Sequence, residues 1–243
     1  DDHITVNDPR QLRHLRRVLR VTSGDELECV DGAGHRYRGP VVRCSRAGLV
    51  MQVAAQETDD PPSWRLTLAQ ALIRQERFDW VIQKATELGV ERIVPLMTAH
   101  TVIRPAKGQW PRKVVRWRLI AEEAAQQCGR STVPAIDTPV PFARFVPSLV
   151  RRTGVVMPTL AVASTPLSRQ LERWKGADAA IALIGPEGDF TRDEAVLAQR
   201  YGASLASLGQ LTLRAETAAI VTLALLQHTM GTRSVSDTVA SGI

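Results

Sequence analysis

The chain has 243 residues, of which 44% are hydrophobic, 23% charged and 5% aromatic. This composition is typical of a globular protein and excludes a disordered or collagen-like chain. The longest uncharged apolar run, 217–227, is shorter than the ~20 residues that cross a bilayer, so no membrane span is predicted. The three cysteines are too few and too far apart for a disulfide framework or a zinc site, which favours a reducing cytoplasm.

The charge is unevenly distributed along the chain. Thirty-one basic and 25 acidic residues give a net charge of +6 and a pI near 9.8, which points to a polyanionic partner. The excess lies in 61–130, which holds 12 basic and 6 acidic residues. No acidic residue occurs between Arg92 and Ala121, or among the five arginines from Arg10 to Arg20. Such runs are typical either of nucleic-acid-binding surfaces or of ordinary solvated faces.

The first 60 residues are predicted to form a small, mostly β domain. Asp8 followed by Pro9 predicts the start of a short helix, because Asp caps helix N-termini and Pro suits the first turn. The strands predicted from turn spacing and composition are 26–30, 37–43 and 49–54. The polar, Pro-rich segment 56–63 is the best linker in the chain. We therefore predict domains at residues 1–60 and 64–243.

Beyond the linker, predicted strands alternate with predicted helices, which indicates an α/β domain on a largely parallel sheet. Apolar residues at helical spacing predict a helix that begins near Phe78 and ends at Gly89. Thr191 and Glu194 have the spacing of a capping box, which predicts the start of another helix. The predicted strands are 66–72, 93–96, 160–163, 180–184 and 204–208. The predicted helices are 78–88, 111–127, 167–174, 191–201 and 216–230.

Two loops that follow predicted strands are the candidate ligand sites, because ligands bind beyond the carboxyl ends of parallel strands. The first loop, 185–190, contains two glycines and a proline, and the second runs from Leu208 to Thr217. Glycine allows the backbone to approach a ligand closely, and Arg214 brings a charge to the start of the last helix. Either loop by itself is equally an ordinary strand-to-helix turn.

Several familiar motifs are absent from the sequence, and their absence reduces the number of reaction types that the protein could catalyse. Gly32 and Gly34 match the first two glycines of the dinucleotide-binding motif GxGxxG, but Tyr37 occupies the place of the third glycine. The sequence contains no P-loop, zinc-protease or nucleophile-elbow motif, and its five histidines have no metal-ligand spacing. Metal catalysis and a nucleotide-dependent enzyme of another class are therefore disfavoured.

Longer stretches resemble the bacterial ribosomal RNA small subunit methyltransferase E family, which belongs to the SPOUT methyltransferases. The motifs that carry the resemblance are Leu183-Ile184-Gly185-Pro186-Glu187-Gly188, Leu208-Gly209 and Leu213-Arg214-Ala215-Glu216-Thr217-Ala218. The resemblance extends through 76–95, 116–134 and 14–20, and so covers nearly the whole chain. Asp189 departs from it, since the family commonly has a second glycine there, and Leu211 stands where arginine is usual.

The resemblance implies a PUA-like RNA-binding domain, a SPOUT-type α/β domain with a trefoil knot, and a cytoplasmic homodimer. It also implies methylation of uridine N3 in 16S ribosomal RNA of the small subunit, with S-adenosylmethionine as the donor. The cofactor-binding residues that it implies are Leu183, Gly185, Pro186, Glu187, Gly188, Leu208, Gly209, Leu213 and Thr217. The residues predicted to hold RNA are Arg13, Arg16, Arg17, Arg20, Arg77, Lys84, Arg104, Arg112, Lys113, Arg116 and Arg130.

Arg214 is the candidate catalytic residue. Uridine N3 must lose its imide proton, and a fixed arginine would stabilise the negative charge that develops on the uracil. Alternatively, Arg214 forms a salt bridge to Glu216 or Glu187 that orders the loop, and Glu187 is a weaker candidate for the proton acceptor. A non-catalytic RNA-binding or ribosome-assembly protein is the alternative interpretation of the chain. It would need the basic segments but would not bind S-adenosylmethionine specifically.

Overall fold

The computed structural model describes residues 2–103, 108–149, 154–174 and 177–231. The chain divides into two compact units, one of Asp1–Pro61 with Gly129–Thr132 and one of Pro62–Cys128 with Val133–Ile243. Within the described ranges, no helix is long and apolar enough to cross a membrane.

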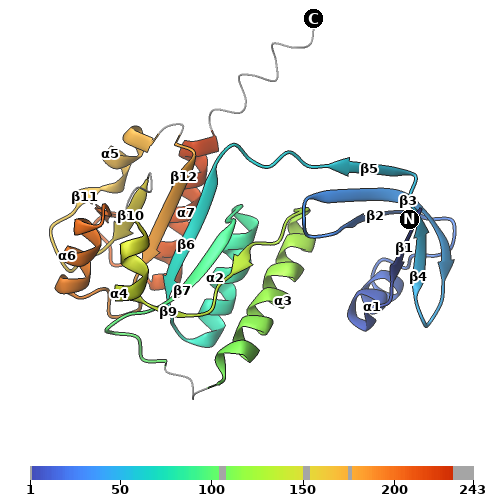
Figure 1. The fold of residues 1–243 in the computed structure, drawn as a ribbon, viewed down its shortest axis with the longest axis horizontal. Helices are drawn as coiled ribbons and strands as arrows, with labels where there is room; N and C mark the ends of the chain where they lie inside the picture. Colours follow the sequence, from blue (N-terminus) through green and yellow to red (C-terminus); the bar gives the residue numbers. More distant parts are fainter. Residues whose placement is uncertain (1, 104–107, 150–153, 175–176, 232–243) are drawn as a thin grey trace, which may run out of the picture. The chain divides into compact units, whose positions relative to one another are not determined.

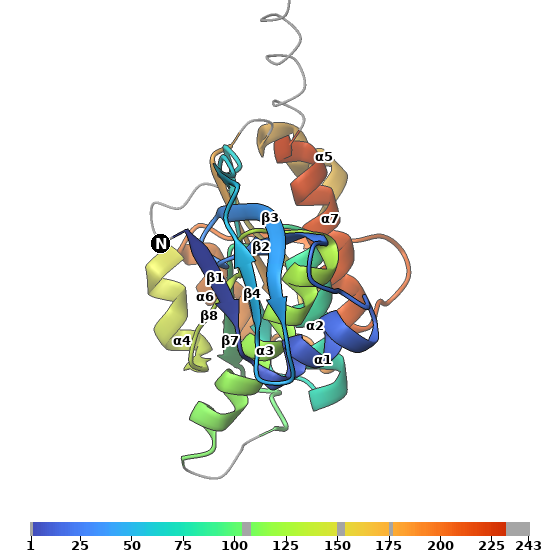
Figure 2. The same cartoon turned by 90° about the vertical axis from the view of Figure 1, so that its right-hand side faces the viewer.

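The first unit is an antiparallel β structure with the helix α1 (Pro9–Arg17) packed beside it (Figure 2). Its strands are β1 (His3–Val6), β2 (Glu26–Val30), β3 (His35–Cys44), β4 (Leu49–Gln52) and β5 (Ala55–Thr58). The strand order is β1-β4-β3-β2, and β5 also pairs with β3. The carboxylate of Asp8 accepts hydrogen bonds of 2.9 Å from the backbone N–H groups of Arg10 and Gln11, so α1 begins where the sequence predicts.

Strand β5 corrects the start of the predicted linker, because residues 56–58 of the predicted segment 56–63 belong to this strand. Residues 55–58 pair antiparallel with residues 35–38 of β3, and all four side chains of β5 are exposed. Backbone hydrogen bonds to a neighbour therefore hold this strand, rather than burial of apolar side chains. Sequence analysis detects strands by alternating hydrophobicity, which a polar edge strand lacks.

The second unit is built on a parallel sheet with the order β11-β13-β10-β12-β6-β7-β8, and β9 also pairs with β7 (Figure 1). Its strands are β6 (Arg65–Ala71), β7 (Arg92–Met97), β8 (Ala135–Ile136), β9 (Val140–Pro141), β10 (Val155–Pro158), β11 (Thr165–Pro166), β12 (Ala179–Ile184) and β13 (Ser204–Ser207). Its α-helices are α2 (Gln75–Glu87), α3 (Trp110–Cys128), α4 (Phe142–Phe145), α5 (Leu167–Leu171), α6 (Arg192–Arg200) and α7 (Ala215–Gly231). The predicted α/β class is confirmed.

Helices cover both faces of this sheet, and each face has its own hydrophobic core. Successive side chains of a strand point to opposite faces. In β6, Leu66 and Leu68 pack in the core formed with α2, α3 and α7. Ala69 of β6 and Leu183 of β12 pack instead in the core formed with α4 and α6. The central strands are thus buried on both sides, and because they run parallel, their carboxyl ends lie at the same edge of the sheet.

Strand β10 corrects the prediction of a strand at 160–163. All four residues of β10 are buried, and the strand pairs in parallel with both β12 and β13. Residues 160–163 form no strand, and Leu160 is 66% exposed. Both segments are short and apolar, so hydrophobicity alone does not separate them. The β-branched pair Val155 and Val156 is the signal that favours the observed strand.

Candidate functional site

A cavity of about 280 Å³ lies at the carboxyl ends of β10, β12 and β13, which are adjacent strands of the parallel sheet. Its walls come from residues 158–160, from residues between 184 and 189, and from residues between 206 and 215. Neighbouring parallel strands end at the same edge of a sheet, which is where ligands bind in such folds. The two loops chosen from the sequence therefore share one cavity. The third wall was not predicted from the sequence, because the apolar pattern placed the strand at 160–163.

Most of the predicted cofactor-binding residues lie on these walls. Those that line the cavity are Gly185, Pro186, Glu187, Leu208, Gly209 and Leu213. Three others lie outside the lining. Leu183 is fully buried in the core against α4 and α6, Gly188 packs against His100, and Thr217 is exposed on α7.

Two glycines shape the cavity walls. A Cβ on Gly185 would stand 3.1 Å from the ring of Phe190, which is only 2% exposed, and 3.2 Å from Oδ1 of Asp189. Gly209 has a φ of 129°, which favours glycine, and no atom lies within 4 Å of where its Cβ would stand. Glycine is therefore needed for packing behind the first loop and for backbone conformation in the second.

Arg77 of α2 joins the two loops through their carboxylates. Its Nη1 lies 3.4 Å from Oε1 of Glu187, and its Nε lies 3.6 Å from Oε1 of Glu216. Glu187 belongs to the first loop and Glu216 to the first turn of α7, so one guanidinium connects three segments that are distant in sequence. Arg77 is predicted to contact RNA, but the structure places its charge against these two carboxylates.

Arg214 lines the same cavity from the second loop, directly before α7. Its side chain is exposed, and it forms no ion pair with any residue that the structure describes. Glu187 and Glu216, its two expected salt-bridge partners, are paired with Arg77 instead. Arg77 therefore fills the loop-ordering role considered for Arg214, and the Arg214 guanidinium is available at the cavity.

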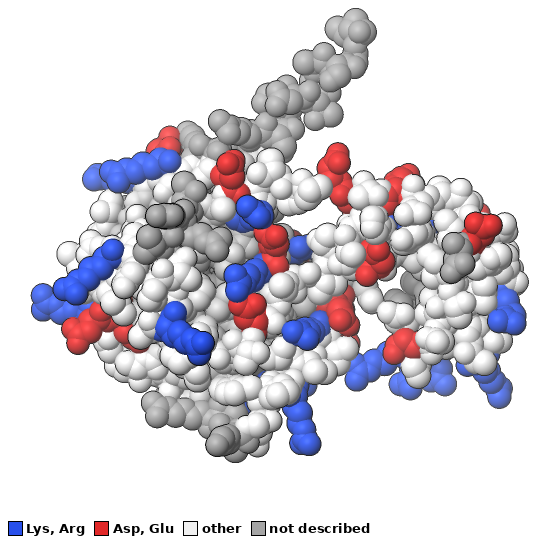
Figure 3. Space-filling model, in the orientation of Figure 1, with Lys and Arg blue, Asp and Glu red and all other residues white. Residues whose placement is uncertain are grey.

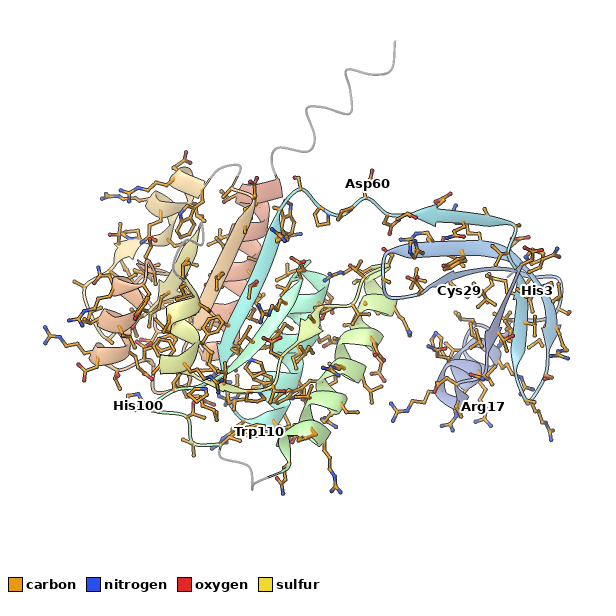
Figure 4. All side chains as sticks on the ribbon, in the orientation of Figure 1. His3, Arg17, Cys29, Asp60, His100 and Trp110 are labelled. Atoms are coloured by element: carbon orange, nitrogen blue, oxygen red, sulfur yellow. The ribbon has the colours of Figure 1, made fainter. Side chains whose placement is uncertain are left out.

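Four of the residues predicted to hold RNA lie on or next to α1 in the first unit. Arg13, Arg16, Arg17 and Arg20 are all exposed, and none forms an ion pair with another described residue. Figure 3 shows positively charged side chains at the edge of this unit where α1 lies, and Figure 4 labels Arg17 there. This surface meets the requirement for phosphate contacts, which is an exposed cation without a competing carboxylate.

The other residues predicted to hold RNA are mostly engaged with protein groups. Lys84 pairs with Glu87 at 2.7 Å, and Arg116 pairs with Asp79 at 2.6 Å. The hydrogen bond to Asp79 raises the pKa of the Arg116 guanidinium. The remaining four are Arg112, which is exposed on α3, Lys113, which donates a hydrogen bond to Gln75, Arg130, which donates one to Thr132, and Arg104, which lies outside the described residues.

His100 holds the first loop of the site in place, a role that the sequence did not predict. It lies on the loop after β7, and its Nδ1 donates hydrogen bonds to the carbonyl oxygens of Gly188 at 2.8 Å and Asp189 at 3.0 Å (Figure 4). A carbonyl oxygen only accepts, so Nδ1 carries the proton. No spacing in the sequence links these loops, which meet because they leave the same edge of the sheet. Among the described residues, no three His, Cys, Asp or Glu side chains gather as a metal ion would require.

Two protein families match successive parts of the chain. The RNA methyltransferase domain matches residues 60–227, and the RNA methyltransferase PUA domain matches residues 6–43. A ribosomal RNA small subunit methyltransferase E from Synechocystis sp. is 32% identical over 215 residues, which cover 88% of this chain and 69% of the relative. The chain belongs to the ribosomal RNA small subunit methyltransferase E family. The PUA match also confirms the predicted character of the N-terminal part.

Other members of the family are similar over most of their length. The Mycobacterium bovis enzyme is 29% identical over 225 residues, covering 90% of this chain and 84% of the relative. A Legionella pneumophila protein, solved with bound SAM, has a TM-score of 0.82 at 29% identity and covers 93% of this chain and 91% of that one. The Neisseria gonorrhoeae family member, bound to S-adenosyl methionine, has a TM-score of 0.80 at 25% identity with the same coverage. These matches confirm the predicted SPOUT-type fold.

Proposed function

We propose that this protein transfers the methyl group of S-adenosylmethionine to N3 of a uridine in 16S ribosomal RNA of the small subunit. One observation carries the proposal: the glycine-containing loops after β12 and β13 share a cavity that Arg214 also lines. The relatives solved with SAM support the choice of donor, and the family name supports the choice of RNA. The family resemblance further supports a knotted, homodimeric, cytoplasmic enzyme with domains at 1–60 and 64–243.

The cavity suits S-adenosylmethionine in its chemistry. Glu187 brings a carboxylate to the wall, which favours a ligand that carries a cationic sulfonium. The residues proposed to hold the donor are Gly185, Pro186, Glu187, Leu208, Gly209 and Leu213. When bound, the donor supplies a methyl group attached to a positively charged sulfur. The rest of the donor leaves as a neutral thioether.

The transfer is an in-line displacement, so the residues of this chain contribute position and charge. Uridine N3 loses its proton during the reaction, and negative charge develops toward O2 and O4 of the uracil. Arg214 is proposed to stabilise this charge, and Glu187 on the same wall is the proposed proton acceptor. N3 lies on the Watson–Crick edge, so the target base must be unpaired or extruded from its helix.

The proposal is tested by nucleoside mass spectrometry of 16S ribosomal RNA. Small subunits from cells lacking this protein are expected to gain one 3-methyluridine when incubated with the purified protein and S-adenosylmethionine. EDTA is expected to leave the yield unchanged, since the sulfonium already carries a good leaving group. Finding the same 3-methyluridine in RNA from wild-type cells and from cells that lack the protein would contradict the proposal. So would methylation at another atom.

The arginines of α1 are expected to contribute binding energy that depends on salt. Replacing Arg13, Arg16 and Arg17 by alanine removes exposed charges, and the slope of log K against log salt for small-subunit binding should fall by about 2–3. The control replaces Arg144, Arg169 and Arg200, which are exposed on α4, α5 and α6. Both triple variants lower the net charge from +6 to +3. Equal slopes for the two variants would mean that α1 is only a solvated face.

A further inference from the structure

Asp189 has an unusual backbone conformation on the wall of the cavity. Its φ is 58°, in the left-handed region that few residues other than glycine adopt, although Asp tolerates it better than most. Its N–H donates to the carbonyl of Pro186 at 3.0 Å, which closes the turn of the first loop. The conformation therefore costs some free energy, and the contacts of the side chain offset that cost.

The carboxylate of Asp189 connects two walls of the cavity. Oδ2 accepts hydrogen bonds from Oγ1 of Thr159 at 2.9 Å and from the backbone N–H of Leu160 at 2.6 Å. Oδ1 accepts from the backbone N–H of Phe190 at 2.7 Å. Thr159, Leu160 and Asp189 all line the cavity, so the bonds run between the segment after β10 and the loop after β12.

The loop that carries Asp189 is itself held from another side. The carbonyl oxygens of Gly188 and Asp189 accept hydrogen bonds from His100, and Oε1 of Glu194 accepts one of 2.8 Å from the backbone N–H of Ala99.

Leu160, in contrast to the first loop, is poorly packed, because its side chain is 66% exposed although it lines the cavity. An apolar side chain at such a position gains free energy by moving into the cavity, away from water.

We propose that Asp189 is a positioning residue that ties the 158–160 wall to the first loop and so keeps the cavity open for its ligand. The proposal rests on the proposed function for the identity of that ligand. Without the carboxylate, the backbone N–H of Leu160 loses its acceptor and the 158–160 segment is free to close over the cavity. Asp189 acts through this segment, so its loss lowers the affinity of the cavity for every ligand, whatever the charge of that ligand.

Hydrogen exchange of the protein without ligand tests the contact directly. In Asp189→Gly, the peptide that spans 158–162 is expected to exchange at least several-fold faster, because the backbone N–H of Leu160 loses its bond. Asp189→Asn keeps a side-chain oxygen acceptor and tolerates the left-handed backbone, so it should restore most of the protection. Asp60→Gly, an exposed residue in the linker, is the matched control and should exchange like wild type. Unchanged exchange at 158–162 in Asp189→Gly would overturn the proposal.

Calorimetry then measures affinity for the cationic S-adenosylmethionine and for the uncharged-sulfur product S-adenosylhomocysteine. Asp189→Gly is expected to lower the affinity for both ligands by a similar factor of about tenfold, which corresponds to about 1.4 kcal/mol. Asp189→Asn should restore much of this affinity. A loss confined to S-adenosylmethionine would show that the carboxylate recognises the sulfonium charge, which overturns the positioning role. Two results together would support the connection between Asp189 and the 158–160 segment but contradict the proposed function. These are faster exchange in Asp189→Gly and a wild-type protein that binds neither ligand.

Discussion

Replacing Arg214 by alanine is expected to lower the rate of methyl transfer by about a hundredfold or more, with S-adenosylmethionine affinity nearly unchanged. Arg214 lines the cavity but forms no ion pair with any described residue, so its removal breaks none that orders the loops. In the proposed mechanism, its charge is needed only when uridine N3 loses its proton. The contribution therefore belongs to the transition state rather than to the bound ground state.

Calorimetric titration and single-turnover methyl transfer separate these two contributions. Undermethylated small subunits serve as the RNA substrate, and the cofactor is kept saturating. Arg214→Lys keeps the charge but loses the planar pair of donors, so an intermediate rate is expected. Arg192→Ala removes an exposed arginine at the start of α6 and is the matched control, with a normal rate expected. If Arg214→Ala also transfers methyl at the normal rate, Arg214 is not catalytic.

The sequence predicted the class of the fold because the relevant signals are local. Helical spacing around Phe78 and the capping box of Thr191 and Glu194 depend on neighbours in sequence, and the structure contains the corresponding helices α2 and α6. The ligand loops were found for a similar reason, since strand, glycine turn and helix follow one another in the chain. The general rule for parallel sheets then places such loops at one edge.

The features that could not be predicted from the sequence depend on contacts between residues that are distant in the chain. Arg77 stands in a helix far from Glu187 and Glu216, and no pattern in the sequence says which carboxylate it meets. The strand order is also non-local, so no pattern in the sequence places β10 between β12 and β13. Placing the strand at 160–163 hid the third wall of the cavity, including the contact between Asp189 and Leu160.

Arg77→Ala is expected to destabilise the fold by about 1–3 kcal/mol, because it leaves a largely buried carboxylate without its counter-charge. The Glu216 side chain is 13% exposed, and its Oε2 is buried without a hydrogen-bond partner. Arg77 is the only ion-pair partner of Glu216 among the described residues, so the charge would then depend on the positive end of the α7 helix dipole, which contributes about 0.3–1 kcal/mol at exposed sites. The variant is thus expected to have a lower melting temperature than wild type, measured by calorimetry without ligand.

The same variant should behave in the opposite way to Arg214→Ala in kinetics. Glu187 lines the cavity and loses the cation that holds it, so affinity for S-adenosylmethionine should fall several-fold. At saturating cofactor, however, the rate of methyl transfer should fall much less than in Arg214→Ala, because Arg77 is proposed to order the loops and hold Glu187, the proposed proton acceptor, rather than to stabilise charge on the uracil. A rate that falls as far as in Arg214→Ala would place Arg77 in the chemical step.

A double-mutant cycle with Glu216→Gln shows whether the ion pair is the cause. Removing the carboxylate charge first should make Arg77→Ala less harmful, with a coupling of about 0.5–3 kcal/mol, as for residues in direct contact. Arg65→Ala, an exposed arginine at the start of β6, is the control for loss of one charge and should show no coupling to Glu216. If the effects of Arg77→Ala and Glu216→Gln simply add, the pair does not stabilise the fold. The connection between α2 and the start of α7 would then rest on packing, while the pair of Arg77 with Glu187 would still connect α2 to the first loop.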